Sequence, residues 1–119
     1  VIQPLPQTRG NVFVDVVDSI VDGLLWEPAL ISQNQAVRIN KNHPYYQKVY
    51  LPSIMNRNAS VGTIEGMDAL LWSLSIAELK TINPSTKDYF EQLRYDVSRN
   101  LRKLVENLPE PPEVNLNGD

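Results

Sequence analysis

Few side chains in this sequence could do chemistry, and the single histidine, His43, is the first to consider. A serine-hydrolase site needs its histidine held by a carboxylate. The acidic residues nearest to His43 in the sequence are Glu27 and Glu65, both distant. A zinc site needs several nitrogen or sulfur donors, and the chain has no cysteine. Because His43 directly precedes Pro44, we interpret it as a turn and cap residue, and a small hydrolase that uses His43 is the least favoured hypothesis.

A second group of chemically capable residues is formed by Asp15, Asp18 and Asp22, whose spacing resembles that of ligands for a hard cation. A calcium loop of the EF-hand type also needs a glycine and a distal glutamate within about 12 residues. The residues between these aspartates are mainly valine and isoleucine, which is typical of a strand. The sequence therefore predicts solvated carboxylates and no metal site.

The glycines give no sign of a nucleotide or cofactor site. Only five are present, and they form no glycine-rich phosphate loop. Gly62 and Gly66 lie where a helix begins, and a helix N-terminus can hold an anion. The segment has no lysine, however, and Glu65 would repel phosphate. We therefore expect no cofactor and no catalytic residue, so the fragment itself is not expected to be an enzyme.

Basic residues gather near the end of the chain, at Arg94, Arg99, Arg102 and Lys103. They could contact an acidic partner or nucleic acid. Acidic residues are interspersed among them, and the whole chain has a formal net charge of −3 and a pI near 5.1. A solvated helix face is the simpler interpretation, and nucleic-acid binding is not expected. A free-standing adaptor or nucleic-acid-associated domain that uses this face is the alternative hypothesis.

The central element of the sequence is the apolar segment Val61–Ile82, which predicts a helix buried by several neighbours because its apolar residues cover more than one stripe. Before it, residues 11–20, 24–31 and 36–39 have the composition of strands. The Asp22-Gly23 dipeptide predicts a hairpin turn between the first two. Pro28 predicts an edge or bulged position for the second.

Two further helices are expected. A short one runs over Pro44–Tyr50, and a long one over Lys87–Leu108. In the long helix one apolar seam has regular spacing: Phe90, Leu93, Val97, Leu101, Leu104 and Leu108. Ser85 or Thr86 is expected to cap it. The predicted fold is α+β: a three-stranded antiparallel meander, then the short helix and a two-helix antiparallel hairpin.

The domain organisation follows from these elements. Residues 1–10 read as a linker or arm, residues 11–108 as a single α+β domain, and residues 109–119, rich in proline, as a disordered tail. No apolar run reaches the ~18 residues of a membrane span, and the start lacks the apolar core of a signal peptide. The first residue is not methionine, so we expect a piece of a longer protein. We expect that protein to be cytoplasmic.

One segment resembles a known family. The sequence WEPALISQNQAVRINKNHPYYQKVY, from Trp26 to Tyr50, is similar to a segment found late in some bacterial and phage proteins of the GHKL ATPase superfamily. There, a strand with tryptophan precedes a strand that ends in a pattern like V-R-I-N-x-x-H-P-F-Y. Here the pattern is Val37 to Asn40 followed by His43, Pro44, Tyr45 and Tyr46, with Tyr45 in place of phenylalanine.

The resemblance covers roughly residues 11–108 and implies a module C-terminal to the ATPase. The family's helix with catalytic glutamate and asparagine and its Asp-x-Gly-x-Gly loop are absent from this sequence, so nothing catalytic carries over. The motif Asn40, His43, Pro44, Tyr45 and Tyr46 is then expected to be structural, turning the chain from sheet to helix.

The preferred hypothesis is a non-catalytic interaction or dimerisation module of a larger GHKL-like protein, with a second copy or the parent protein's own domains as partners and no membrane. The predicted central helix, Val61–Ile82, has more apolar surface than one partner helix and a three-stranded sheet need to cover, and large aromatic side chains often anchor interfaces. The expected interface residues are Trp26, Trp72, Leu101 and Leu104.

Overall fold

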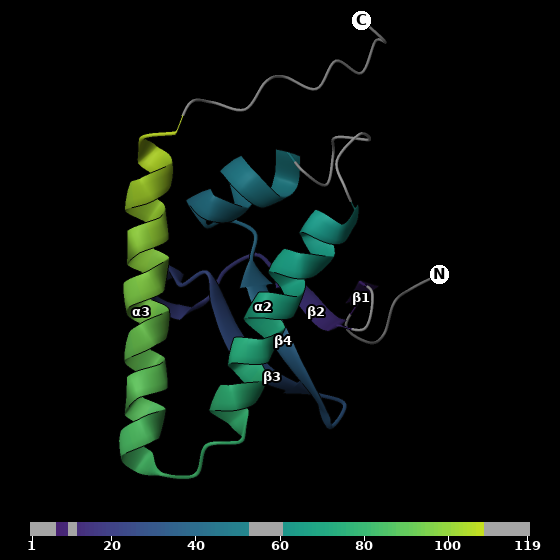
Figure 1. Ribbon diagram of the computed structural model, residues 1–119, viewed down its shortest axis with the longest axis vertical. Helices are drawn as coiled ribbons and strands as arrows, with labels where there is room; N and C mark the ends of the chain where they lie inside the picture. The colour runs from purple at the N-terminus through teal and green to yellow at the C-terminus, as the bar shows by residue number, and fades with distance from the viewer. Residues whose placement is uncertain (1–6, 10–11, 53–60, 109–119) are drawn as a thin grey trace, which may run out of the picture.

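The computed structural model describes residues 7–9, 12–52 and 61–108, and it confirms an α+β fold. A sheet is followed by two long helices (Figure 1). The elements are β1 (Gln7–Arg9), β2 (Val12–Val17), η1 (Val21–Gly23), β3 (Trp26–Ile31), β4 (Asn34–Asn40), η2 (Tyr46–Tyr50), α2 (Val61–Leu79) and α3 (Pro84–Glu106).

The sheet is mixed, so the predicted purely antiparallel meander is wrong in this detail. The strand order is β1-β2-β4-β3, and β2 pairs with β4 in parallel, with Val14 opposite Val37. The Asp22-Gly23 dipeptide does not close a hairpin. It lies in the 3-10 turn η1, where Asp22 has a φ of 61°, and β3 then begins at the outer edge of the sheet instead of beside β2.

The hairpin turn lies one connection later, between β3 and β4. Ser32 and Gln33 have φ values of 52° and 68°, and the flanking residues Ile31 and Asn34 are paired. Two successive residues with positive φ are what a two-residue type I′ loop requires. The sequence carries no glycine here, so this turn lacked its usual signal.

The two edges of the sheet differ from each other. Gln7–Arg9, within the segment expected to be an arm, form β1 and pair antiparallel with β2. At the other edge, β3 pairs with β4 alone within the described sheet, which confirms the edge position predicted from Pro28.

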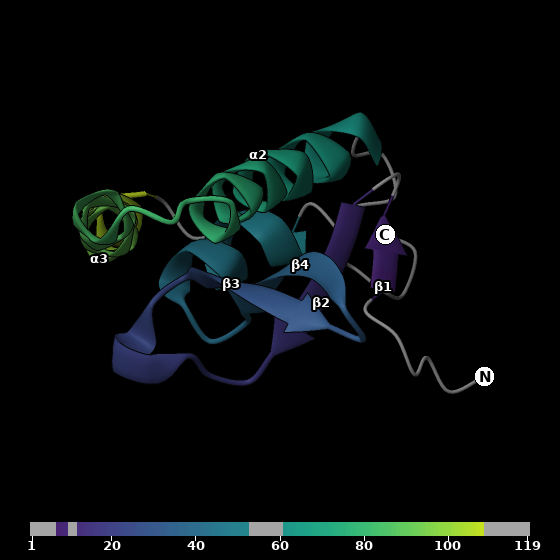
Figure 2. The ribbon, with the colours of Figure 1, turned by 90° about the horizontal axis from the view of Figure 1, so that it is seen from below.

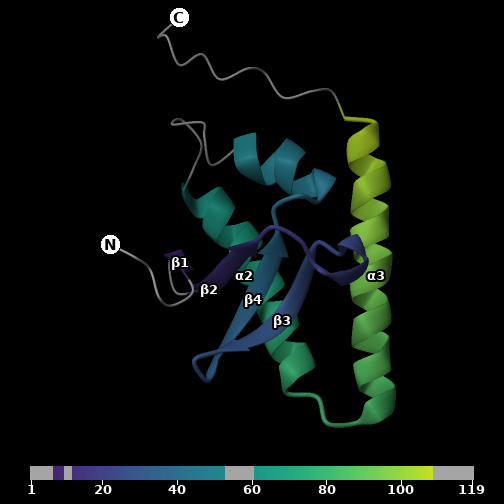
Figure 3. The same ribbon diagram turned by 180° about the vertical axis from the view of Figure 1, so that it is seen from behind.

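The core lies between the sheet and α2, which crosses one face of the sheet (Figure 2). It contains mainly aliphatic and aromatic side chains from the strands, η2 and α2: Val14, Leu25, Trp26, Val37, Ile39, Tyr46, Tyr50 and Leu71. On the opposite face, seen in Figure 3, a row of ion pairs crosses three strands. Arg38 lies 3.6 Å from both Asp15 and Glu27, and all three side chains are partly exposed.

The helix α3 runs antiparallel to α2 and lies beside the β3 edge of the sheet (Figures 1 and 2). Asn83, and not Ser85 or Thr86, caps it: the Asn83 side-chain oxygen accepts hydrogen bonds from the Ser85 and Thr86 amides. Pro84 occupies the first helical turn, where its missing N–H is not needed. Within the described residues, no helix is long and apolar enough to cross a bilayer.

Candidate functional site

The motif carried by the family resemblance forms the corner between the end of β4 and η2. The Asn40 side chain is buried and holds two chain segments together. Its Nδ2 donates to the Leu24 carbonyl at 3.0 Å, and its Oδ1 accepts from the Asn42 amide at 2.9 Å. Asn40 therefore stabilises both the turn after β4 and the approach to β3.

His43, next in this corner, is fully buried, and both of its ring nitrogens are engaged. Its Nδ1 accepts from the Tyr45 amide at 3.0 Å. Since that nitrogen must be unprotonated to accept, Nε2 carries the proton and donates to the Ser98 carbonyl of α3 at 2.9 Å. Burial lowers the pKa of His43, the Ser98 carbonyl opposes this, and nearby Arg102 adds a further lowering.

This geometry makes His43 a neutral link between the corner and α3. A general base or a metal ligand needs a ring nitrogen that faces a substrate or a metal ion. Here both nitrogens face backbone groups. Among the described residues, no group of three or more histidine, cysteine, aspartate or glutamate side chains is placed to hold a metal ion.

The tyrosines that follow His43 pack η2 between the two long helices. The rings of Tyr46 and Tyr50 stack with centroids 5.0 Å apart, and Tyr45 meets Tyr50 edge-on at 6.1 Å. The Tyr45 hydroxyl contacts the Met67 sulfur of α2 at 3.8 Å, and burial raises the pKa of Tyr45. Towards α3, Lys48 Nζ donates to the Val105 carbonyl at 3.0 Å.

Ser98, a residue that sequence reasoning missed, lies at the centre of the α3 contact. It is 3% exposed, and its Oγ accepts from the Leu25 amide, beside β3, at 2.9 Å. Its carbonyl also accepts from His43. No hydrophobicity pattern could have indicated this position, because the group that matters is a small hydroxyl.

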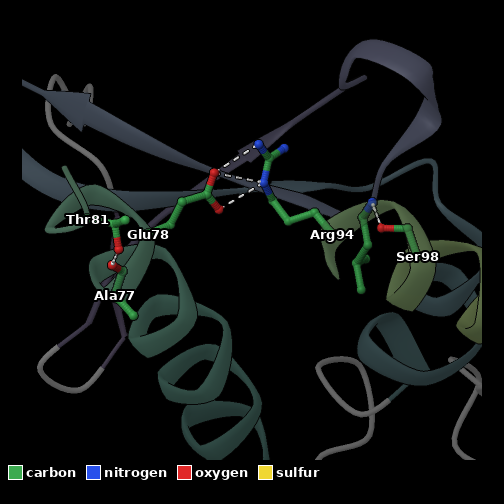
Figure 4. A network of polar contacts seen from close by, with 6 residues as sticks. Ala77, Glu78, Thr81, Arg94 and Ser98 are labelled. Carbon is green, nitrogen blue, oxygen red and sulfur yellow. Dashed lines mark hydrogen bonds and ion pairs between the residues drawn. The ribbon is translucent and has the colours of Figure 1, made fainter. Parts of the chain in front are cut away.

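Arg94 is the second polar attachment of α3. Its guanidinium pairs with both oxygens of Glu78 in α2, with Nε–Oε1 and Nη2–Oε2 distances of 2.9 and 3.0 Å (Figure 4). The two side chains are only 13% and 14% exposed. A bidentate pair shielded in this way fixes the geometry between the two helices.

The face of α3 towards the domain therefore combines polar and apolar side chains. It consists of Arg94, Ser98, Leu101 and Val105, at successive spacings of 4, 3 and 4. The apolar seam is centred to one side of this face and overlaps it at Leu101, since each residue advances about 100° around a helix. As a result Leu93, Leu104 and Leu108 are 38%, 56% and 40% exposed.

We call Phe90, Leu93, Val97, Leu101 and Leu104 the α3 stripe. Its middle residues, Val97 and Leu101, are half-buried and pack against the core. Leu93 and Leu104 are exposed on either side of them. On α2, Leu70 is also 63% exposed.

The four residues predicted to lie at an interface have different environments. Trp26 is 1% exposed and belongs to the core, so its predicted interface role is wrong. Trp72 is half-buried, and its Nε1 donates to the Gln35 carbonyl at 3.4 Å. Leu101 is half-buried against the core, and Leu104 is exposed. Only Leu104 is freely accessible.

The basic residues of α3 are partly neutralised by neighbours. Arg94 forms an ion pair with Glu78, and Arg99 forms one with Asp96 at 2.7 Å. Arg102 donates to the Gly23 carbonyl at 3.2 Å. This arrangement leaves less free positive charge than the sequence alone indicated.

A shallow cavity of about 250 Å³ lies between η1 and α3. Its wall includes Asp22, Tyr95, Ser98, Arg99 and Arg102. The Tyr95 hydroxyl donates to the Asp22 carboxylate, and this hydrogen bond raises the pKa of Tyr95. One carboxylate and two guanidinium groups line this small space, so charges of both signs face it.

In comparisons with known proteins, no family model, no curated protein and no solved structure matches the chain.

Proposed function

We propose that this chain is a non-catalytic interaction module whose binding surface is the α3 stripe. One observation carries the proposal: polar links as well as Val97 and Leu101 attach α3 to its domain, while Leu93 and Leu104 of its regular apolar seam are left exposed. An amphipathic helix normally buries its apolar side against its own domain. A helix that leaves part of its apolar side exposed has that part available for another protein.

The partner is a second copy of the chain or another domain of the same parent protein. The similarity of residues Trp26 to Tyr50 to the GHKL superfamily supports such a parent, with the nucleotide held by a separate domain. The buried hydrogen bonds of Asn40 and His43 support a structural role for the shared motif. In this proposal the parent protein is a cytoplasmic ATPase, and the present module couples the nucleotide state of that ATPase to the contacts of a dimer.

Solution association tests the proposal directly. The chain is examined by sedimentation velocity from about 1 µM to about 1 mM, a range that covers weak to moderate affinities. We expect concentration-dependent self-association that Leu104→Glu abolishes, because a charge would have to be buried at the contact. Ser73→Glu adds the same charge at an exposed site of α2 and serves as the matched control.

Two results would count against this function. A wild-type chain that stays monomeric throughout the range removes the self-association part. Equal loss of association in both variants would show that net charge, and not the α3 stripe, controls it.

The parent protein is tested separately by sequencing the coding DNA upstream of Val1. A helix with glutamate and asparagine followed by an Asp-x-Gly-x-Gly loop is the expected result. An initiation codon immediately before Val1 would remove the ATPase from the proposal.

Nucleic-acid binding through the basic residues of α3 is the weaker candidate. Arg94 and Arg99 are paired with acidic side chains, and the net charge is negative. Binding to DNA that weakens steeply as salt is added would be needed to restore it.

A further inference from the structure

We propose that two copies of this chain associate through antiparallel pairing of α3 with α3, with the two-fold axis at Val97. The inference rests on the proposed function and specifies its partner and geometry. Three independent features of α3 support it: the spacing of the stripe, its exposure and the distribution of charge along the helix.

The spacing of the α3 stripe is the same in both directions. The intervals between Phe90, Leu93, Val97, Leu101 and Leu104 are 3, 4, 4 and 3 residues. When a second helix runs antiparallel, this pattern places Phe90 opposite Leu104, Leu93 opposite Leu101, and Val97 opposite its own copy. A two-fold dimer requires such a self-complementary patch, because each residue of one subunit meets its counterpart in the other.

Exposure along the stripe fits the same arrangement. Leu93 and Leu104, on either side of Val97, are 38% and 56% exposed. The polar attachments Arg94 and Ser98 face the domain. A second helix can therefore approach Leu93 and Leu104 without breaking these polar attachments, and it meets the exposed part of Val97 and Leu101, whose other side packs on the core.

Charge along α3 selects the antiparallel orientation. In the N-terminal half, with Arg94 paired to Glu78 and Asp96 paired to Arg99, the remaining charged residues are Lys87, Asp88 and Glu91, with a net charge of −1. In the C-terminal half they are Arg102, Lys103 and Glu106, with a net charge of +1. Antiparallel pairing brings the acidic half of one helix alongside the basic half of the other, and the helix dipoles favour the same orientation. Parallel pairing would align like charges.

The size of the contact sets the expected strength. A helix of 23 residues is about 35 Å long. A single helix pair of this length buries an area at the low end of specific protein interfaces. The dimer should therefore be reversible and dependent on concentration.

Single-cysteine cross-linking tests the orientation, and the natural chain suits it because it contains no cysteine. Three variants, Val97→Cys, Phe90→Cys and Leu104→Cys, are oxidised under mild conditions at a concentration where the wild-type chain associates. A disulfide forms only where the two Cα atoms come within about 7 Å. Ser73→Cys, at an exposed position of α2, measures random cross-linking.

We expect Val97→Cys to cross-link with itself. Phe90→Cys and Leu104→Cys should each stay near the Ser73→Cys background alone, but should cross-link with each other when mixed. If Val97→Cys fails to fold, the mixture of Phe90→Cys and Leu104→Cys still distinguishes antiparallel from parallel pairing, because Leu104 is exposed and tolerates substitution.

The outcomes separate this geometry from the proposed function. Strong self-linking of Phe90→Cys or of Leu104→Cys would show parallel pairing and overturn the inference, although the module would still be a dimer. Association of the wild-type chain without cross-linking above background at any α3 position would place the contact elsewhere. A wild-type chain that is monomeric throughout would overturn the self-association part of both proposals.

Discussion

Acidification from pH 7.5 to 5.5 should destabilise this protein through His43. The residue is fully buried as a neutral ring, and burial lowers its pKa in the folded state. In the unfolded chain its pKa returns to about 6.5. Below that pH the unfolded state binds a proton that the folded state does not, so the free energy of unfolding falls as the pH falls. Above it, the stabilisation is fully present.

The size of the effect follows from proton linkage for one group. If the folded ring stays neutral across the window, the loss between pH 7.5 and pH 5.5 approaches about 1.4 kcal/mol. His43 is the only histidine in the chain, so no other side chain has an ordinary pKa between these values. Protonation would also place a second donor at Nδ1, which now accepts from the Tyr45 amide.

Urea unfolding at a fixed low protein concentration measures this dependence, with the midpoint converted to a free energy through an unchanged slope. His43→Gln is the matched control, because it cannot titrate, and its stability should be nearly flat over the same window. NMR of the His43 ring should show a titration midpoint below pH 6.5 in the folded protein, because burial lowers the pKa of His43. Constant or rising wild-type stability on acidification, or an equal pH slope in His43→Gln, would refute the reasoning.

Three further predictions concern α3. Ser98→Ala should lower the free energy of unfolding by about 1–3 kcal/mol in a urea titration, because the buried Leu25 amide loses its acceptor; no loss would mean that the amide finds another partner. A double-mutant cycle with Arg94→Met and Glu78→Gln should give a coupling of about 1–3 kcal/mol, above the value for exposed ion pairs, since both side chains are mostly shielded; additive effects would contradict this. Asn83→Ala should lower thermal stability by about 1 kcal/mol through loss of the α3 cap, while Asn83→Ser should retain most of it.

The number of strands and helices in the main body of the fold could be predicted because composition and periodicity are local. The connectivity of the sheet could not. Asp22-Gly23 is a common hairpin sequence, yet in this fold it forms a 3-10 turn on the way to the outer edge strand. Ser32 and Gln33, which do close the hairpin, are not typical of that turn. Pro28 was more informative, because its missing donor restricts a strand whatever its neighbours are.

The orientation of α3 shows a different limit. Its apolar seam predicted a helix correctly, but the natural expectation was that the seam would face the domain. In the structure Val97 and Leu101 of the seam pack against the core, while the polar contacts beside them come from Arg94 and Ser98. Their partners, Glu78 and the Leu25 amide, are far away in the sequence, and a polar residue gives no sign of a distant partner. Trp26 failed as an interface residue for the related reason that an aromatic side chain suits a core as well as a surface.

The manner in which α3 is attached also bears on function. Its polar links lie at three levels along the helix: Arg94 with Glu78, Ser98 with Leu25 and His43, and the Val105 carbonyl with Lys48. An ordinary hydrogen bond contributes only about 1 kcal/mol net, but it requires a defined geometry. Such links therefore fix the rotation of α3 about its own axis more effectively than they add stability. A fixed rotation is what a helix needs if its apolar stripe is to meet a partner, because a turn of about 100° would exchange Val97 for Ser98 at the surface.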